Sequence, residues 1–180
     1  MVHTPKPIEP SGSVMKRLVT FTTKAYRCEI ECLDPDQVIP LLRDLGATVT
    51  QVKSADVQYV LERSVFFKLK LTNTGPDDLV FNPDHVIVGS GRGPVASLVD
   101  MATFWPATVP EGHADREALA KIFARATVSL ASDETHVQYL AFRAFGGRFP
   151  KNIYLELNDL YAGVEPFSMK CAFKIKYRDL

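Results

Sequence analysis

Alternation of apolar and polar residues is the feature that most constrains the fold of this chain. Within residues 63–83, one strand face collects four apolar side chains at every second position: Val65, Phe67, Leu69 and Leu71. The opposite face carries Lys68, Lys70 and Thr72, together with Phe66. A period of two places successive side chains on opposite faces of a β-strand. The pattern predicts a strand with one buried face and one mostly cationic face.

A turn and a second apolar run follow this strand directly. The polar residues 73–78 include Gly75, which permits a positive φ, and Pro76, which fixes φ and lacks a backbone donor. A second apolar run begins at residue 79. Two strand patterns separated by a short polar turn indicate a β-hairpin.

Further strand patterns recur along most of the chain. They are predicted at residues 14–22, 24–33, 47–53, 57–61, 86–88, 127–130, 136–142, 153–157 and 167–177. The outer face of residues 167–177 is rich in Lys, which is typical of an edge strand. Seven to nine short strands joined mostly by local turns favour a mainly β fold, an antiparallel β-sandwich, over a parallel α/β sheet.

Helical patterns and a polar leader complete the predicted organisation. Asp34 and Pro35 resemble a helix start, and Pro40 limits the expected helix at 36–46 to a short one that ends at Gly46. Helical spacing returns within residues 94–126, which we expect to form a helical insert. Residues 1–13, rich in Pro, indicate a flexible leader. Residues 14–180 then form a single β-sandwich domain.

The charge balance and hydropathy exclude some classes of partner. Lys and Arg together number 21, as do Asp and Glu, so the formal net charge is zero. Nucleic-acid binding driven by phosphate contacts is therefore not expected. No apolar run approaches the roughly 20 residues of a transmembrane helix. The first residues lack a secretory signal, so the chain is either cytosolic or exported with its signal removed.

The order of strands and turns resembles the immunoglobulin-like β-sandwich domains of exported bacterial proteins and lipoproteins. The matching segments are SVFFKLKLTNTGPDDLVFNPDHVIV, then ATVSLASDETHVQYLAF and FPKNIYLEL. They cover roughly residues 57–177 as a pattern. The resemblance implies a binding or assembly module in the cell envelope. The chain departs from that pattern in lacking a signal peptide or anchoring cysteine near its start, and in its insert at 94–126.

Three cysteines occupy predicted apolar strand faces. Cys28 and Cys32 are four residues apart on one strand, about 13 Å at ~3.3 Å per residue, which is too far for a mutual disulfide. The resemblance implies that the first and last strands are neighbours, which would bring Cys171 near one of the two. In an oxidising compartment Cys171 would then pair with Cys28 or Cys32. The alternative, which we favour, is three buried thiols that act as small apolar side chains.

The sequence contains no established catalytic or metal-binding motif. Gly89, Gly91 and Gly93 follow a strand, but their G-x-G-x-G spacing differs from that of dinucleotide- and phosphate-binding loops, so we interpret the segment as a turn. The four histidines lack metal-ligand spacing, and no Ser-His-Asp signature appears. We expect neither a cofactor nor enzymatic activity. A hydrolase whose site the sequence does not reveal is a third class of function.

Three aromatic residues are candidates for contact with a partner. Phe104 and Trp105, the only Trp, lie in the expected insert, and Phe66 interrupts an otherwise cationic strand face. Aromatic residues are enriched in interface hot spots. The alternative is that Phe104 and Trp105 pin the insert onto its own sandwich and that the insert covers Phe66.

Two functional hypotheses follow from the sequence. The first is a non-catalytic binding or assembly module that contacts a protein partner in a bacterial cell envelope. The second is a metal-handling sandwich that binds copper through scattered His, Met and Cys ligands, because β-sandwiches include copper-handling proteins. Met169 and Cys171 share one strand face, although we expect that face to belong to the core.

Overall fold

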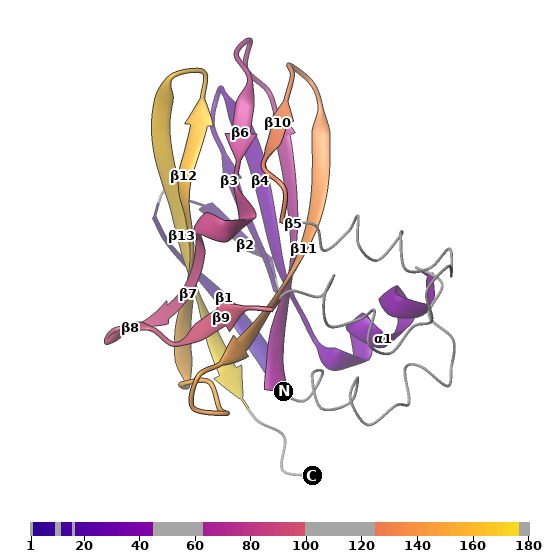
Figure 1. The fold of residues 1–180 in the computed structure, drawn as a ribbon, viewed down its shortest axis with the longest axis vertical. Helices are drawn as coiled ribbons and strands as arrows, with labels where there is room; N and C mark the ends of the chain where they lie inside the picture. The colour runs from indigo at the N-terminus through magenta and orange to yellow at the C-terminus, as the bar shows by residue number, and fades with distance from the viewer. Residues whose placement is uncertain (1, 10–11, 16, 45–62, 100–124, 177–180) are drawn as a thin grey trace.

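The computed structural model describes residues 2–9, 12–15, 17–44, 63–99 and 125–176, which form two antiparallel β-sheets (Figure 1). This architecture confirms the expected mainly β fold and the β-sandwich. The immunoglobulin-like topology stays a prediction. The described residues form thirteen strands, more than the expected seven to nine, because several are only two to four residues long.

The first sheet, sheet A, contains seven strands in the order β1-β13-β12-β6-β10, with β7 pairing both β12 and β8. Its strands are β1 (Val2–Glu9), β6 (Leu79–Phe81), β7 (Val86–Ser90), β8 (Gly93–Pro94), β10 (Val128–Leu130), β12 (Asn152–Ala162) and β13 (Glu165–Lys176). A short 3₁₀ helix, η1 (Pro83–His85), joins β6 to β7.

The second sheet, sheet B, contains six strands in the order β2-β3-β4-β5-β11-β9. Its strands are β2 (Gly12–Met15), β3 (Leu18–Thr22), β4 (Tyr26–Leu33), β5 (Ser64–Asn73), β9 (Ala96–Leu98) and β11 (Thr135–Ala144). Helix α1 (Pro35–Asp44) follows β4.

The core lies between the two sheets and is built from the alternating apolar positions. Phe67 of sheet B and Phe173 of sheet A meet with their ring centroids 5.1 Å apart. Tyr26 and Phe167 stack at 4.3 Å. The largest fully buried aromatic side chains are Phe21, Phe67, Phe81, Phe142 and Phe173. Each Phe or Leu side chain buried in this way stabilises the fold by about 1.5–3 kcal/mol.

The hairpin predicted within residues 63–83 is wrong. Its two strands exist, but β5 belongs to sheet B and β6 to sheet A, so the connection crosses from one sheet to the other (Figure 1). The polar turn residues required by a hairpin are also those required by such a crossing, and they do not distinguish the two. Gly75 does not have a positive φ. A Cβ at this position would instead lie 3.1 Å from Ala25 Cα, so close approach of the backbone accounts for the glycine.

Three other expectations differ from the structure. Residues 2–9 of the expected flexible leader form β1, and its prolines fit because β1 is an edge strand with one neighbour. The Lys-rich β13 is not an edge strand, since it lies between β1 and β12. Ala96–Leu98 forms β9 where a helix was expected. The rest of the expected insert up to residue 124, and the predicted strands at 47–53 and 57–61, lie outside the described residues.

Helix α1 confirms the helix predicted after Asp34. The Gln37 side chain accepts a hydrogen bond from the Asp34 backbone N–H at 2.9 Å, which is the reciprocal half of a capping box. Pro35 occupies the first helical position, where a missing donor costs least. Arg17 also forms an ion pair with Asp34. These contacts fix the point at which the chain leaves sheet B.

Candidate functional site

A pocket of about 400 Å³ opens where β11 ends and β5 begins. Its described lining residues are Arg63, Ser97, Arg143, Ala144, Phe145 and Gly147. In the strand register, Arg143 lies opposite Ser64 of β5 on one side and opposite Ser97 of β9 on the other. Residues directly opposite one another project to the same face of a sheet. Three neighbouring strands therefore place Ser64, Arg143 and Ser97 in one row at this end of sheet B.

The pocket combines positive charge with an exposed aromatic ring. Arg63 and Arg143 supply two guanidinium groups, and Phe145 is 67% exposed. The Phe145 backbone N–H donates to Val95 O at 2.9 Å, which holds the start of the loop against the segment that leads into β9. Gly147 has a φ of +76°, a conformation that favours glycine. The Ser64 hydroxyl is buried and has no hydrogen-bond partner among the described residues.

The opposite end of β5 is closed by a buried amide. Asn73 Nδ2 donates to Asp77 O at 2.7 Å and to Leu130 O at 2.9 Å, and Asn73 Oδ1 accepts from Gly75 N at 3.0 Å. This one side chain thus connects the crossing after β5 to the end of β10. The TNTG motif that contributed to the family resemblance is therefore explained here by hydrogen bonding within the fold.

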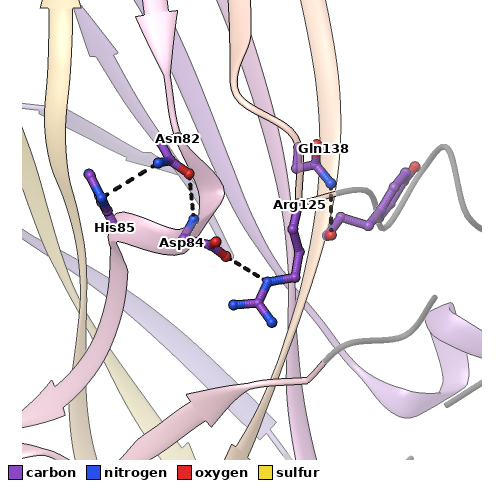
Figure 2. A network of polar contacts seen from close by, with 6 residues as sticks. Asn82, Asp84, His85, Arg125 and Gln138 are labelled. Atoms are coloured by element: carbon purple, nitrogen blue, oxygen red, sulfur yellow. Dashed lines mark hydrogen bonds and ion pairs between the residues drawn. The ribbon is translucent and has the colours of Figure 1, made fainter. Parts of the chain in front are cut away.

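A second group of polar side chains surrounds η1 (Figure 2). Arg125 Nε donates to Asp84 Oδ1 at 2.6 Å, and Asn82 Oδ1 accepts from Asp84 N at 3.0 Å, which caps η1. His85 Nδ1 lies 3.0 Å from Asp159 Oδ2, where β12 carries a bulge and Asp159 has a φ of +50°. The described contacts of His85 are with Asn82 and Asp159.

The outer face of sheet B carries a ladder of opposite charges. Glu29 lies opposite Lys70 in the register, and their charged atoms are 3.4 Å apart, while Arg27 contacts Glu29 at 2.6 Å. Partial burial alone would raise the pKa of Glu29, but hydrogen bonds from Arg27 and Lys70 outweigh it and lower that pKa. The sequence indicated the cationic face of β5. Strand pairing places Glu29 of β4 opposite Lys70 on that face.

Cys28, Cys32 and Cys171 are buried free cysteines. Their burial agrees with the interpretation as small apolar side chains, and the pairing of Cys171 with Cys28 or Cys32 stays a prediction. All three project into the core between the sheets. Burial raises the pKa of each thiol, and the nearby Cys171 raises the pKa of Cys28 and Cys32 further. A thiol with a raised pKa stays protonated and is a poor nucleophile or metal ligand.

Of the three aromatic candidates, only Phe66 is described. It is 3% exposed and lies in a row with Leu33 and Ala141 on the outer face of sheet B. Together with Val38 of α1, these residues are buried outside the main core. This burial argues against Phe66 as an exposed contact for a partner, and its coverage by the insert stays a prediction. Phe104 and Trp105 lie outside the described residues.

The glycine segment 89–94 forms the β7–β8 turn, as interpreted from its spacing. Gly93 has a φ of +107°. A Cβ on Gly89 would come within 2.4 Å of the Tyr154 ring, which therefore lies directly over this glycine. Lys170 Nζ lies 3.8 Å from the centre of the same ring and 3.0 Å from Glu156. The close approach serves packing on the outer face of sheet A.

The pocket residues were missed by the sequence analysis. Arg63 and Arg143 are remote in sequence and meet only through the pairing of β5 with β11. The available signal was the pair of exposed loop positions that follow β11, Phe145 and Gly147, beside an arginine at the strand end.

Two further features of the structure, and the comparisons with known proteins, bear on the site. Within the described ranges, no group of three or more His, Cys, Asp or Glu side chains is placed to hold a metal ion. No helix among these residues is long and apolar enough to cross a bilayer. Protein-family models, curated proteins and solved structures contain no match to this chain.

Proposed function

We propose that this chain is a non-catalytic β-sandwich module that binds a protein partner at the pocket end of sheet B. The observation that carries the proposal is the exposed ring of Phe145 beside Arg63 and Arg143 in one pocket. Aromatic residues and arginine are enriched in interfaces, where a few of them supply most of the binding energy. A single exposed apolar residue is common on protein surfaces, but one beside two arginines in a pocket has the composition of a hot spot.

The remaining parts of the functional hypothesis rest on the sequence. The resemblance to envelope domains supports a location in a bacterial cell envelope. The composition of residues 104–105 supports a contribution from Phe104 and Trp105 to the same contact. Both belong to the proposal and are tested with it.

Photo-crosslinking in the cells that naturally produce the chain tests this function. p-Benzoylphenylalanine is introduced at Phe145 of the full chain and, as a matched control, at Val164, which is 93% exposed in the β12–β13 turn. We expect a discrete protein adduct from position 145 and none from position 164. Adducts from position 164 alone, or the same diffuse set of adducts from both, would contradict the proposed surface.

The aromatic residues of the insert are tested on the same adduct. Phe104→Ala and Trp105→Ala are each combined with the crosslinker at position 145. We expect a weaker adduct from either variant, provided that circular dichroism shows an unchanged fold. An adduct of full intensity in both variants would remove these two residues from the contact.

A further inference from the structure

We propose that the pocket at the end of sheet B binds a carboxylate group of an acidic peptide segment, with Arg63 and Arg143 as its donors. The inference rests on the proposed function and deepens it, because it names the chemistry of the partner. It follows from the charge of the pocket, from the buried hydroxyl beside it and from the exposed ring at its rim.

The charge of the pocket favours an anion. Arg63 and Arg143 line the same cavity, and the other described lining residues, Ser97, Ala144, Phe145 and Gly147, carry no side-chain charge. Two guanidinium groups in one pocket repel each other, and an anion bound between them adds an attraction to each that offsets this repulsion. A guanidinium has five donors in a planar fork that matches a carboxylate. Each arginine also interacts with another part of the chain, and five donors allow both roles.

Hydroxyl groups add polar capacity at the same place. Ser97 lines the pocket directly. Ser64 shares the row of Arg143 across the strand pair, is 1% exposed, and has a hydroxyl without a partner among the described residues. Buried polar groups are almost always hydrogen-bonded in proteins. Because Ser64 lies opposite Arg143, a ligand held by Arg143, or a water bound with that ligand, would complete the hydrogen bonding of this hydroxyl.

The exposed ring distinguishes a peptide from a simple inorganic anion. Phe145 lies at the rim and is largely uncovered. A pocket of about 400 Å³ falls within the range of ~300–1,000 Å³ that small ligands occupy. An inorganic phosphate would match the charge and leave the ring in water. A peptide would place a carboxylate between the arginines and an adjacent apolar side chain against Phe145.

The test is an NMR titration of the full, isotope-labelled chain at low salt. The probes are acetyl-Phe-Asp-Glu-Phe-amide, its neutral analogue acetyl-Phe-Asn-Gln-Phe-amide, and inorganic phosphate. We expect the acidic peptide to shift the amide signals of Ser97, Arg143 and Phe145. The neutral peptide should bind at least about tenfold more weakly, the equivalent of ~1.4 kcal/mol. Phosphate should shift the signals of Ser97 and Arg143 only weakly and leave those of Phe145 unchanged.

Arginine variants assign the effect to the pocket. Arg143→Gln should weaken binding of the acidic peptide about tenfold or more. Arg63→Gln should weaken binding by the same factor. Because residue 63 precedes β5 and Arg143 lies within β11, this second variant keeps the test valid if Arg143→Gln does not fold. Arg92→Gln, at an exposed position in the β7–β8 turn, removes the same charge outside the pocket and should change the Kd by less than about twofold.

Several outcomes would overturn the inference. Equal binding of the neutral peptide, or equal loss in Arg92→Gln, would reduce the effect to general attraction. Phosphate that binds more tightly than the acidic peptide would assign the pocket to a phosphate group instead. A position-145 adduct that persists while the acidic peptide does not bind would refute this inference alone. Peptide binding without an adduct would refute the protein-binding function and leave the chemistry of the pocket in place.

Discussion

Each end of β5 carries a buried polar side chain, and the two side chains differ in their hydrogen bonding. Asn73 and Ser64 are each only 1% exposed. The Asn73 side chain makes three hydrogen bonds to backbone groups of the crossing and of β10. The Ser64 hydroxyl has no partner among the described residues. The polar side chain at one end of the strand is fully hydrogen-bonded, and the hydroxyl at the other end, opposite Arg143, has no described partner.

Within one strand, the two ends therefore contrast a polar side chain that stabilises the fold with one that we propose serves binding. A buried polar group that is fully hydrogen-bonded adds to stability, whereas an unpaired one subtracts from it. Folds retain the unpaired kind mainly where it serves binding or chemistry. Mutations at the two ends should therefore change the free energy of unfolding in opposite directions.

Asn73→Ala should have the largest effect. It removes three hydrogen bonds and leaves the Leu130 carbonyl without its side-chain donor, so we expect a loss of about 3 kcal/mol in the free energy of unfolding. Chemical denaturation measures it. Asn82→Ala, which removes the exposed cap of η1 and a 3.5 Å contact with His85, is the matched control and should cost about 1 kcal/mol. Equal losses in the two variants would mean that Asn73 does not anchor this end.

The next largest effect on the free energy of unfolding is expected from Gly75→Ala, for which Gly146→Ala is the matched control. Gly75→Ala places a Cβ 3.1 Å from Ala25 Cα, against backbone that also accepts hydrogen bonds from Thr74 N and Gly75 N, and should cost about 1–2 kcal/mol. Gly146→Ala, in open space at the pocket end, should leave stability unchanged or raise it by up to about 1 kcal/mol. Thermal and urea unfolding of the two variants compare them. A stabilising Gly75→Ala would show that Ala25 gives way easily.

Ser64→Ala should have the smallest effect, and a positive one. It removes a buried hydroxyl that lacks a described partner, so the free energy of unfolding should rise by about 1 kcal/mol. Ser97→Ala, on an exposed residue of the same row, should change it by less than about 0.5 kcal/mol. A clear loss of stability in Ser64→Ala would mean that the hydroxyl is paired in solution, and the contrast between the two ends would weaken.

Sequence patterns predicted the local features of this fold correctly and did not predict the features that depend on pairing between distant strands. The alternation around Phe67 identified β5 and its buried face, because side-chain period is a property of one segment. The crossing at Gly75 was predicted as a hairpin, since turn chemistry does not reveal which sheet the next strand joins. Residues 1–13 were predicted as a flexible leader from their prolines, but an edge strand such as β1 tolerates proline as well.

The candidate site was beyond the sequence for the same reason. Arg63 and Arg143 converge through the register of β5 with β11, which no local pattern encodes. The ladder between Glu29 and Lys70 likewise required knowledge of strand pairing, although the cationic face of β5 was visible by itself. The thiols were the easier case, because their burial followed directly from alternation within single strands.

The position of β13 between β1 and β12 has a consequence for biosynthesis. Strands β2 to β5 are neighbours in sheet B in the order in which the ribosome makes them, whereas β1 waits for β13, near the end of the described chain. Contacts between segments far apart in sequence form slowly. Until β13 emerges, the apolar face bearing Cys28 and Cys32 lacks part of its cover, so the nascent chain exposes a surface that invites aggregation or chaperone capture.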